Sequence, residues 1–130
     1  MSKYQSSNLS PQKATQIRSQ LLFLLENQKI YQNPNLTLPY LAKRIQTNTK
    51  YLSQVINQQF NYNFTTLINH YRIKEFKQRL LSKETLQFTY FGLAQEYGFH
   101  NRSTFYRAFK SNLKLSPKQF IQYHEQMSLS

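Results

Sequence analysis

Hydrophobic residues recur three and four positions apart along most of the chain, and short polar intervals separate the stretches that carry this spacing. Ile17, Leu21, Leu24 and Leu25 form the first such stripe, which begins after Ser10. This spacing places apolar side chains on one face of an α-helix. Only two Gly and four Pro occur in the chain, so few residues interrupt the pattern. The sequence therefore predicts an all-α fold.

Two short amphipathic helices meet at a glycine turn in the stretch 92–110. Leu93, Ala94 and Tyr97 lie on one face of the first helix, and Gly98 ends it, because glycine adopts a left-handed backbone at little cost. Asn101 can cap the second helix. The apolar positions of that helix are Phe105, Ala108 and Phe109. Such a pair predicts a helix-turn-helix, a motif whose second helix enters the DNA major groove.

The same arrangement occurs a second time, nearer the start of the chain. Leu41 matches Leu93 at an offset of 52 residues, and Leu52 matches Phe105 at an offset of 53. One inserted residue in the second turn explains the change of offset. The chain therefore contains an internal repeat of two helix-turn-helix motifs.

The two turns of the repeat differ at one position, where Gln46 matches Gly98. Glutamine adopts a left-handed backbone at a cost of about 1 kcal/mol. We therefore expect the first turn to differ in shape from the second.

A long helix is predicted between the two motifs, over residues 63–81. The apolar positions of its first half are Phe64, Leu67, Ile68 and Tyr71, and those of its second half, on nearly the opposite side, are Ile73, Phe76 and Leu80. This change of face predicts that each half packs against a different lobe; the alternative is one two-sided core helix in a single bundle. At 1.5 Å per residue the helix is about 28 Å long, near the ~34 Å between successive major-groove faces of B-DNA.

The pattern predicts two helix-turn-helix lobes joined by a linker helix and preceded by an N-terminal helix. The expected segments are a disordered lead-in (1–9), the N-terminal helix and turn (10–33), the first helix-turn-helix (34–62), the linker helix (63–81), the second helix-turn-helix and closing helix (82–124) and a frayed tail (125–130). In the N-terminal helix Leu22 and Phe23 widen the apolar stripe. Either these side chains are buried, or they contact a partner or a segment of a longer protein.

Charge and composition narrow the function. The 17 Lys and Arg residues outnumber five acids, giving a formal net charge of +12, and this imbalance suits a polyanionic partner. The chain has no Cys and no Asp, and its three His lie in separate segments. We therefore expect no metal site, no cofactor and no enzymatic activity. No apolar run approaches the ~20 residues that span a bilayer.

Five short motifs together resemble one known family. They are Leu38-x-x-Leu-Ala-x-x-Ile45, Tyr51-Leu-Ser-Gln-Val-Ile56, Ala94-x-x-Tyr-Gly-Phe99, Phe105-Tyr-Arg-Ala-Phe-Lys110 and Ser116-Pro-x-x-Phe120. The pattern is similar to the DNA-binding domain of the AraC/XylS family of bacterial transcription regulators, over about residues 36–123. This resemblance implies double-stranded DNA as the partner, RNA polymerase as a further partner, and a cytoplasmic location.

The segment 33–38 and the N-terminal helix resemble a variety of this family in which the domain ends a longer sensor protein, often embedded in a membrane. That resemblance implies a further partner, a sensor segment N-terminal to this chain. It also implies that the chain is the cytoplasmic output domain of such a sensor.

Polar side chains on the second helix of each motif are the candidate base readers. Arg102 and Arg107 can each donate two hydrogen bonds to guanine O6 and N7. Ser103 lies on the same face, and so does Tyr106, which either reads a base or packs against its own lobe. The repeat gives the first-lobe counterparts as Thr49, Lys50, Ser53 and Gln54. The family places base contacts on these two helices.

Phosphate contacts are expected at helix N-termini and at nearby polar side chains. The residues at the helix starts are Thr37, Thr89 and Asn101, where free backbone N–H groups can bind a phosphate. The side-chain candidates are Lys43, Arg44, Asn57 and Lys110. The three cations among them are alternatively solvated surface charges.

Two other classes of function compete with DNA binding. A basic helical adaptor for a protein or an anionic membrane surface fits the charge, but it does not require polar outer faces on two equivalent helices. RNA binding also fits the charge, but the aromatic sheet motifs of RNA-binding modules are missing from the sequence. Duplex DNA is therefore the favoured partner.

Overall fold

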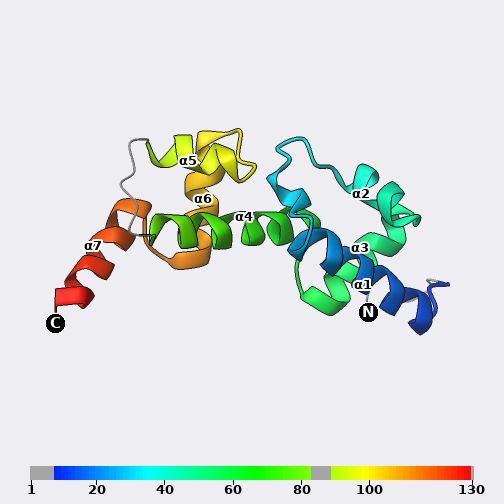
Figure 1. Ribbon diagram of the computed structural model, residues 1–130. Helices are drawn as coiled ribbons and strands as arrows, with labels where there is room; N and C mark the ends of the chain where they lie inside the picture. The colour runs from blue at the N-terminus through cyan, green and yellow to red at the C-terminus, as the bar shows by residue number, and fades with distance from the viewer. Residues whose placement is uncertain (1–7, 83–88, 130) are drawn as a thin grey trace. The chain divides into compact units, whose positions relative to one another are not determined.

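The computed structural model describes residues 8–82 and 89–129 (Figure 1), and these residues are helical without any strand. The elements are α1 (Pro11–Glu26), the 3₁₀ turn η1 (Ile30–Gln32), α2 (Leu38–Ile45), α3 (Thr49–Phe60), α4 (Phe64–Leu80), α5 (Tyr90–Glu96), α6 (Arg102–Leu113) and α7 (Pro117–Leu129). The all-α prediction is confirmed. Residues 83–88, near the start of the segment expected at 82–124, and most of the lead-in at 1–9 lie outside the described residues.

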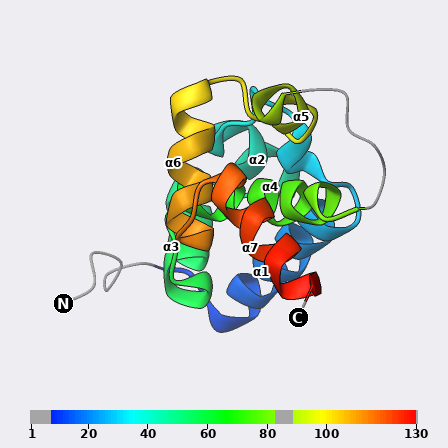
Figure 2. The same cartoon turned by 90° about the vertical axis from the view of Figure 1, so that its left-hand side faces the viewer.

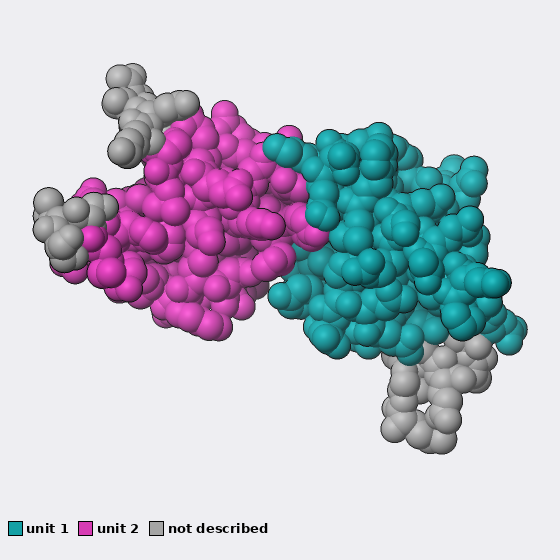
Figure 3. Space-filling model, turned by 60° about the horizontal axis from the view of Figure 1, so that its bottom comes forward, with its two compact units in different colours: residues 1–30, 35–68 teal, residues 31–34, 69–130 magenta. Residues whose placement is uncertain are grey.

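The chain divides into two compact units (Figure 3). The first unit holds residues 1–30 and 35–68, and the second holds residues 31–34 and 69–130. The segment expected at 10–33 is thus divided, because Tyr31, Gln32 and Asn33 are hydrogen-bonded to Arg72 and Glu75 of α4.

Helix α4 contributes to both units, as the change of apolar face predicts. Leu67 and Ile68 are buried and belong to the first unit, whereas Ile73 and Phe76 are buried in the core of the second. Tyr71 departs from the prediction, because its ring lies 5.7 Å from the ring of Tyr31 in the second unit.

The first unit is built from α1, α2, α3 and the start of α4. Helix α1 packs against both α2 and α3 through the predicted stripe, which is buried at Ile17, Leu21, Leu24 and Leu25. Phe23 does not join this stripe, since its side chain is 51% exposed. The α1 helix therefore has an apolar face in the core and an exposed aromatic ring beside it.

The second unit has an aromatic core around Phe76 of α4. Its ring lies edge-on to Phe105 at 4.9 Å and to Phe109 at 5.7 Å, both on α6. Phe109 in turn meets Phe120 of α7 at 5.7 Å. Helix α6 contacts both α5 and α7 (Figure 2). Edge-to-face pairs of this kind add about 0.5–1.5 kcal/mol each beyond their buried area.

Both turns use the same backbone hydrogen bonds, and the expected difference in shape is seen in their backbone dihedral angles. In the first, Gln46 N donates to Lys43 O and Thr47 N to Ala42 O; in the second, Gly98 N donates to Gln95 O and Phe99 N to Ala94 O. Gln46 adopts the left-handed region with φ 64°, and Gly98 has φ 109°. The glutamine thus accepts the backbone strain, and the two turns differ in dihedral angle rather than in bonding.

Helix α7 is longer than predicted. It runs to Leu129, so the expectation of a frayed tail from residue 125 is wrong within the described part of the chain. Ser116 caps α7 by accepting from Gln119 N, and Gln119 Oε1 accepts from Ser116 N, which forms a capping box. His124 packs on Phe120 at 4.4 Å between ring centroids and supports the helix one turn beyond the last core residue.

Candidate nucleic-acid interface

Of the two helices expected to read bases, α3 and α6, the outer face of α6 carries more charged side chains. Every predicted side chain on it is exposed, namely Arg102, Ser103, Tyr106, Arg107 and Lys110. The opposite face is fixed in the core by Phe105 and Phe109, both 0% exposed. Because the core holds one side of α6, the direction of its polar side is set.

Two side chains of this row rest on aromatic rings. The Arg102 guanidinium carbon lies 5.1 Å from the ring centroid of Phe91, a cation–π contact that restricts the side chain while leaving it exposed. The Tyr106 ring lies 4.8 Å from that of Phe105 and remains 36% exposed. Tyr106 therefore packs against its own unit and is still partly exposed, and a base-reading role for it stays a prediction.

The counterpart face on α3 is less exposed and less charged. Thr49, Lys50 and Asn57 are exposed, and Ser53 is half-buried. The side chain of Lys50 is the one cation among these positions. The matched row on α6 has three cations, so α3 offers a weaker electrostatic surface.

Gln54 was predicted to lie on the exposed outer face of α3, but it is buried. Its side chain is only 8% exposed, and its Oε1 is buried without a hydrogen-bond partner among the described residues. The matched residue of α6, Arg107, is exposed. Because α3 packs against α1 as well as α2, less of α3 is open to solvent than its own apolar pattern indicates. The expected position of Gln54 on the exposed outer face of α3 is therefore wrong.

The helix starts lie where the sequence places them. The side chains of Thr37, Thr89 and Asn101 accept hydrogen bonds from Tyr40 N, Gly92 N and Thr104 N, respectively. Each cap satisfies one of the N–H groups that a helix N-terminus leaves unpaired, and the remaining ones can bind water or an anion.

The side-chain candidates for phosphate contacts fall into two groups. Lys43, Asn57 and Lys110 are exposed. Arg44 is exposed but already engaged within the first unit, since it donates to Gln28 Oε1 at 3.1 Å and to the Tyr40 hydroxyl at 3.4 Å. These bonds hold its guanidinium beside α1 and reduce its freedom to follow a DNA backbone.

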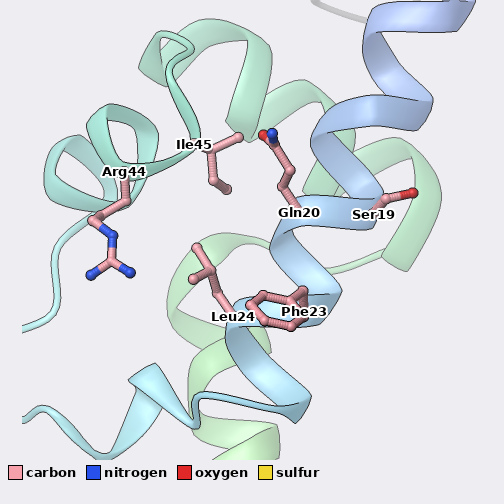
Figure 4. A pocket seen from close by; sticks show the side chains of 6 residues that line it. All are labelled: Ser19, Gln20, Phe23, Leu24, Arg44 and Ile45. Atoms are coloured by element: carbon pink, nitrogen blue, oxygen red, sulfur yellow. The ribbon is translucent and has the colours of Figure 1, made fainter.

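Arg44 also lines an open hollow of about 300 Å³ in the first unit (Figure 4). Its other lining residues are Ser19, Gln20, Phe23, Leu24 and Ile45. Helices α1 and α2 form its walls.

A family model described as a helix-turn-helix domain matches residues 41–123. The match runs from within α2 to within α7 and covers well over half of the chain. The chain belongs to the AraC/XylS-type helix-turn-helix family.

Solved structures similar to this AraC/XylS-type domain support the same assignment. The C-terminal domain of AraT, a response regulator from Geobacillus stearothermophilus, is 26% identical; the similarity covers 90% of this chain and 88% of that one, with a TM-score of 0.69. The C-terminal domain of the two-component response regulator yesN from Fusobacterium nucleatum is 23% identical over 79% and 97% of the two chains, with a TM-score of 0.65. A Listeria innocua protein of unknown function is 22% identical over 82% and 95%, with a TM-score of 0.68. The last two establish the fold alone. No curated protein matches the sequence.

As an AraC/XylS-type domain, the chain is a DNA-binding module of transcription regulation, and its family is one of regulators rather than enzymes. Within residues 8–82 and 89–129, no group of three or more His, Asp, Glu or Cys side chains is placed to hold a metal ion. None of the described helices is long and apolar enough to cross a membrane.

Three residues that the hydrophobic pattern and the motifs do not single out are prominent in the structure, namely Arg72, Tyr31 and Glu75. They form a hydrogen-bonded cluster beside the turn of the second motif. An arginine between Tyr71 and Ile73, where α4 changes its buried face, was the available indication.

Proposed function

We propose that this domain binds double-stranded DNA sequence-specifically, with α6 and α3 each entering a major groove. The observation that carries the proposal is the exposed row on α6, from Arg102 to Lys110, on a helix whose other face is fixed in the core. A rigidly seated helix with cationic and hydrogen-bonding side chains on its open face fits the groove-reading role of a helix-turn-helix.

Arg102 and Arg107 are the principal base readers in this proposal. Their guanidinium groups match the O6 and N7 acceptors of guanine, and the Phe91 ring under Arg102 restricts its conformations before binding. Ser103 and the exposed edge of Tyr106 complete the set on α6. Lys110, nearer the C-terminal end of α6, contacts a phosphate.

The first motif reads with Thr49, Lys50 and Ser53, and Gln54 has no part in it. Since this set contains a single cation, α3 contributes less to affinity than α6. Lys43, Asn57 and the helix starts at Thr37, Thr89 and Asn101 supply phosphate contacts, which position the domain without reading sequence.

The two motifs should read two base blocks on one duplex. Support comes from the repeat itself, because two copies of one reading motif in one chain need no dimer to contact two half-sites. We expect the two preferred blocks to lie about one helical turn apart, near 10 base pairs, so that both face the same side of the DNA.

The response-regulator neighbours suggest where the domain acts in a longer protein. AraT and yesN both carry the similar domain at their C-termini. We infer that this chain likewise works as the output part of a regulator whose N-terminal segment receives the input, and that its DNA complex is the species that meets RNA polymerase.

The test is selection of bound duplexes from a random DNA pool by the wild type and single variants. Arg102→Ala and Arg107→Ala should each relax the preference in one block, at a cost of about 1–3 kcal/mol on the preferred sequence. Lys50→Ala should relax the other block. Lys110→Ala should weaken all sequences alike, and Gln54→Ala, the buried match of Arg107, should leave the preference unchanged.

Two outcomes would contradict the proposal. If the arginine variants lose affinity but keep the wild-type preference, these residues position the protein and do not read bases. If the wild type binds anionic liposomes or single-stranded RNA as tightly as duplex DNA at the same salt concentration, the adaptor or RNA alternative is favoured instead.

A further inference from the structure

The segment Tyr31–Pro34, named here the connector, follows α1 and precedes α2 in sequence yet is bound by α4 in the second unit. Arg72 Nε donates to the Tyr31 carbonyl oxygen at 2.7 Å, and its Nη2 donates to the Asn33 carbonyl oxygen at 2.9 Å. One turn further along α4, the Glu75 carboxylate accepts a hydrogen bond from the Tyr31 hydroxyl. The connector is thus held through its backbone and through a side chain.

A second pair of contacts reinforces this grip. Gln32 Nε2 donates to both carboxylate oxygens of Glu75, at 3.1 and 2.9 Å. The Tyr31 side chain is 5% exposed, and its ring packs against that of Tyr71 at 5.7 Å. The connector is therefore packed on the second unit through Tyr31 and Gln32, whereas Asn33 and Pro34 are exposed.

Arg72 is the central residue of the cluster. It is 8% exposed, and burial lowers the pKa of its guanidinium to about 10, so that it stays charged at neutral pH. The guanidinium carbon also lies 5.7 Å from the ring centroid of Phe99. A planar fork can donate to two carbonyl groups while stacking on a ring, which the ammonium group of lysine cannot do.

The cluster lies directly against the turn of the second motif. A Cβ atom added to Gly98 would come within 3.0 Å of both the Tyr31 carbonyl oxygen and the Arg72 Nε. The next residue, Phe99, packs under Arg72 and also lies 5.3 Å from the ring of Phe105 on α6. A continuous set of contacts therefore runs from the connector, through the turn, to the buried face of α6.

We propose that Arg72 and the connector are positioning elements for α6, which fix the turn at Gly98 and Phe99 and so set the orientation in which α6 presents Arg102 to the bases. This inference rests on the proposed function, because it takes α6 as a DNA-reading helix. The connector then determines the base preference of a motif that begins more than fifty residues later in the sequence.

The internal repeat supplies a contrast within the same chain. At the offset of 52 residues, Gln20 and Phe23 of α1 match Arg72 and Glu75 of α4, and Gln46 matches Gly98. Gln20 and Phe23, the sequence matches of the two residues that bind the connector, line the open hollow of the first unit (Figure 4). A side chain is accommodated at Gln46, which is exposed, whereas the connector leaves no room for one at Gly98.

The experiment compares Arg72→Lys and Tyr31→Phe with the wild type, and Gln20→Ala serves as the matched control in the first unit. Arg72→Lys keeps the charge but removes the fork, and Tyr31→Phe removes only the hydroxyl bonded to Glu75. Without DNA, amide exchange at Gly98 and Phe99 should accelerate about ten- to a hundredfold in Arg72→Lys, since hydrogen bonds to a charged group are lost. In duplex selection, the preference in the block read by α6 should fall about tenfold, with the other block unchanged.

The outcomes separate this inference from alternatives. Unchanged exchange at the turn together with unchanged preference in both blocks would overturn it. A uniform loss of affinity without any change of base preference would also overturn it. A residue that only stabilises the fold lowers the folded fraction of the protein, and this weakens binding to all sequences alike. If Arg72→Lys fails to fold, Tyr31→Phe and Gln32→Ala decide by the same two measurements.

Failure of the proposed function would look different. In that case Arg102→Ala and Arg107→Ala would leave the base preference unaltered, whatever happens in the connector variants. The exchange measurement needs no DNA, so it still reports whether Arg72 and the connector hold the turn.

Discussion

Gly98→Ala should destabilise the second unit more than any other single-methyl change at an exposed or turn position. The added Cβ has to occupy space within 3.0 Å of the Tyr31 carbonyl oxygen and the Arg72 Nε. Neither group can retreat easily, because one is backbone and the other is buried and bonded to Tyr31 and Asn33. Either the turn or the connector must therefore move.

The magnitude follows from two contributions. The positive φ of 109° costs a residue with a side chain about 1–2 kcal/mol. Displacement of the connector weakens at least one hydrogen bond to the Arg72 guanidinium, which contributes about 1.5–3 kcal/mol. The free energy of unfolding should therefore fall by about 2.5–5 kcal/mol, a large fraction of the ~5–15 kcal/mol typical of a small domain.

Urea denaturation gives the total loss, and hydrogen exchange assigns it to a unit. Gln46→Gly at the matched turn is the control, and it should change stability by less than about 1 kcal/mol, because relief of the left-handed strain is offset by the greater chain entropy of glycine. If Gly98→Ala costs less than about 1 kcal/mol, or if protection is lost equally in both units, the packing of the connector against the turn does not have the importance that the contacts indicate.

Three further predictions concern charge, packing and pH. DNA affinity should fall steeply with salt, with a log–log slope of about −0.9 per phosphate neutralised; a flat titration would remove the electrostatic argument from the +12 charge. Phe76→Ala should cost about 3–5 kcal/mol and Leu67→Ala about 2–5 kcal/mol, with loss of exchange protection mainly in the second and the first unit respectively; equal losses in both units would show one cooperative core. Burial and the hydrogen bond to Glu75 raise the pKa of the Tyr31 phenol, so above pH 10 the folded state keeps a proton that the unfolded state loses, and stability should fall with rising pH. Tyr31→Phe should show a shallower fall above pH 10 in urea titrations, and an identical slope would contradict the assignment.

Periodicity and capping residues predicted the elements of the second unit well. Phe105, Ala108 and Phe109 are buried as their spacing indicates, and Asn101 caps α6 by accepting from Thr104 N. The change of face along α4 likewise placed Ile73 and Phe76 in the second core. These are local properties, because the residue pattern within one helix determines which of its faces is buried.

The errors concern contacts with elements that the local pattern does not contain. Gln54 lies away from the apolar face of α3, and its burial depends on what covers the rest of that helix. The sequence places Tyr31 in the turn after the N-terminal helix. Nothing near it in sequence indicates that Arg72 and Glu75 bind it. Helix spacing predicts the core face of each element, but it cannot show which distant segment fills the space beside a turn.

The position of the connector has a practical consequence for dissecting the protein. Each unit is made of two separate pieces of sequence, so neither can be obtained by cutting the chain once. The family match begins at residue 41, inside α2, and a fragment trimmed to that boundary would lose the start of α2 as well as Tyr31 and Asn33. Arg72 would then be buried with two unpaired donors. Gly98 would no longer lie against the carbonyl oxygen of Tyr31. Binding measured on such a fragment would report a recognition helix released from its support, so fragments for DNA-binding studies should start before α1.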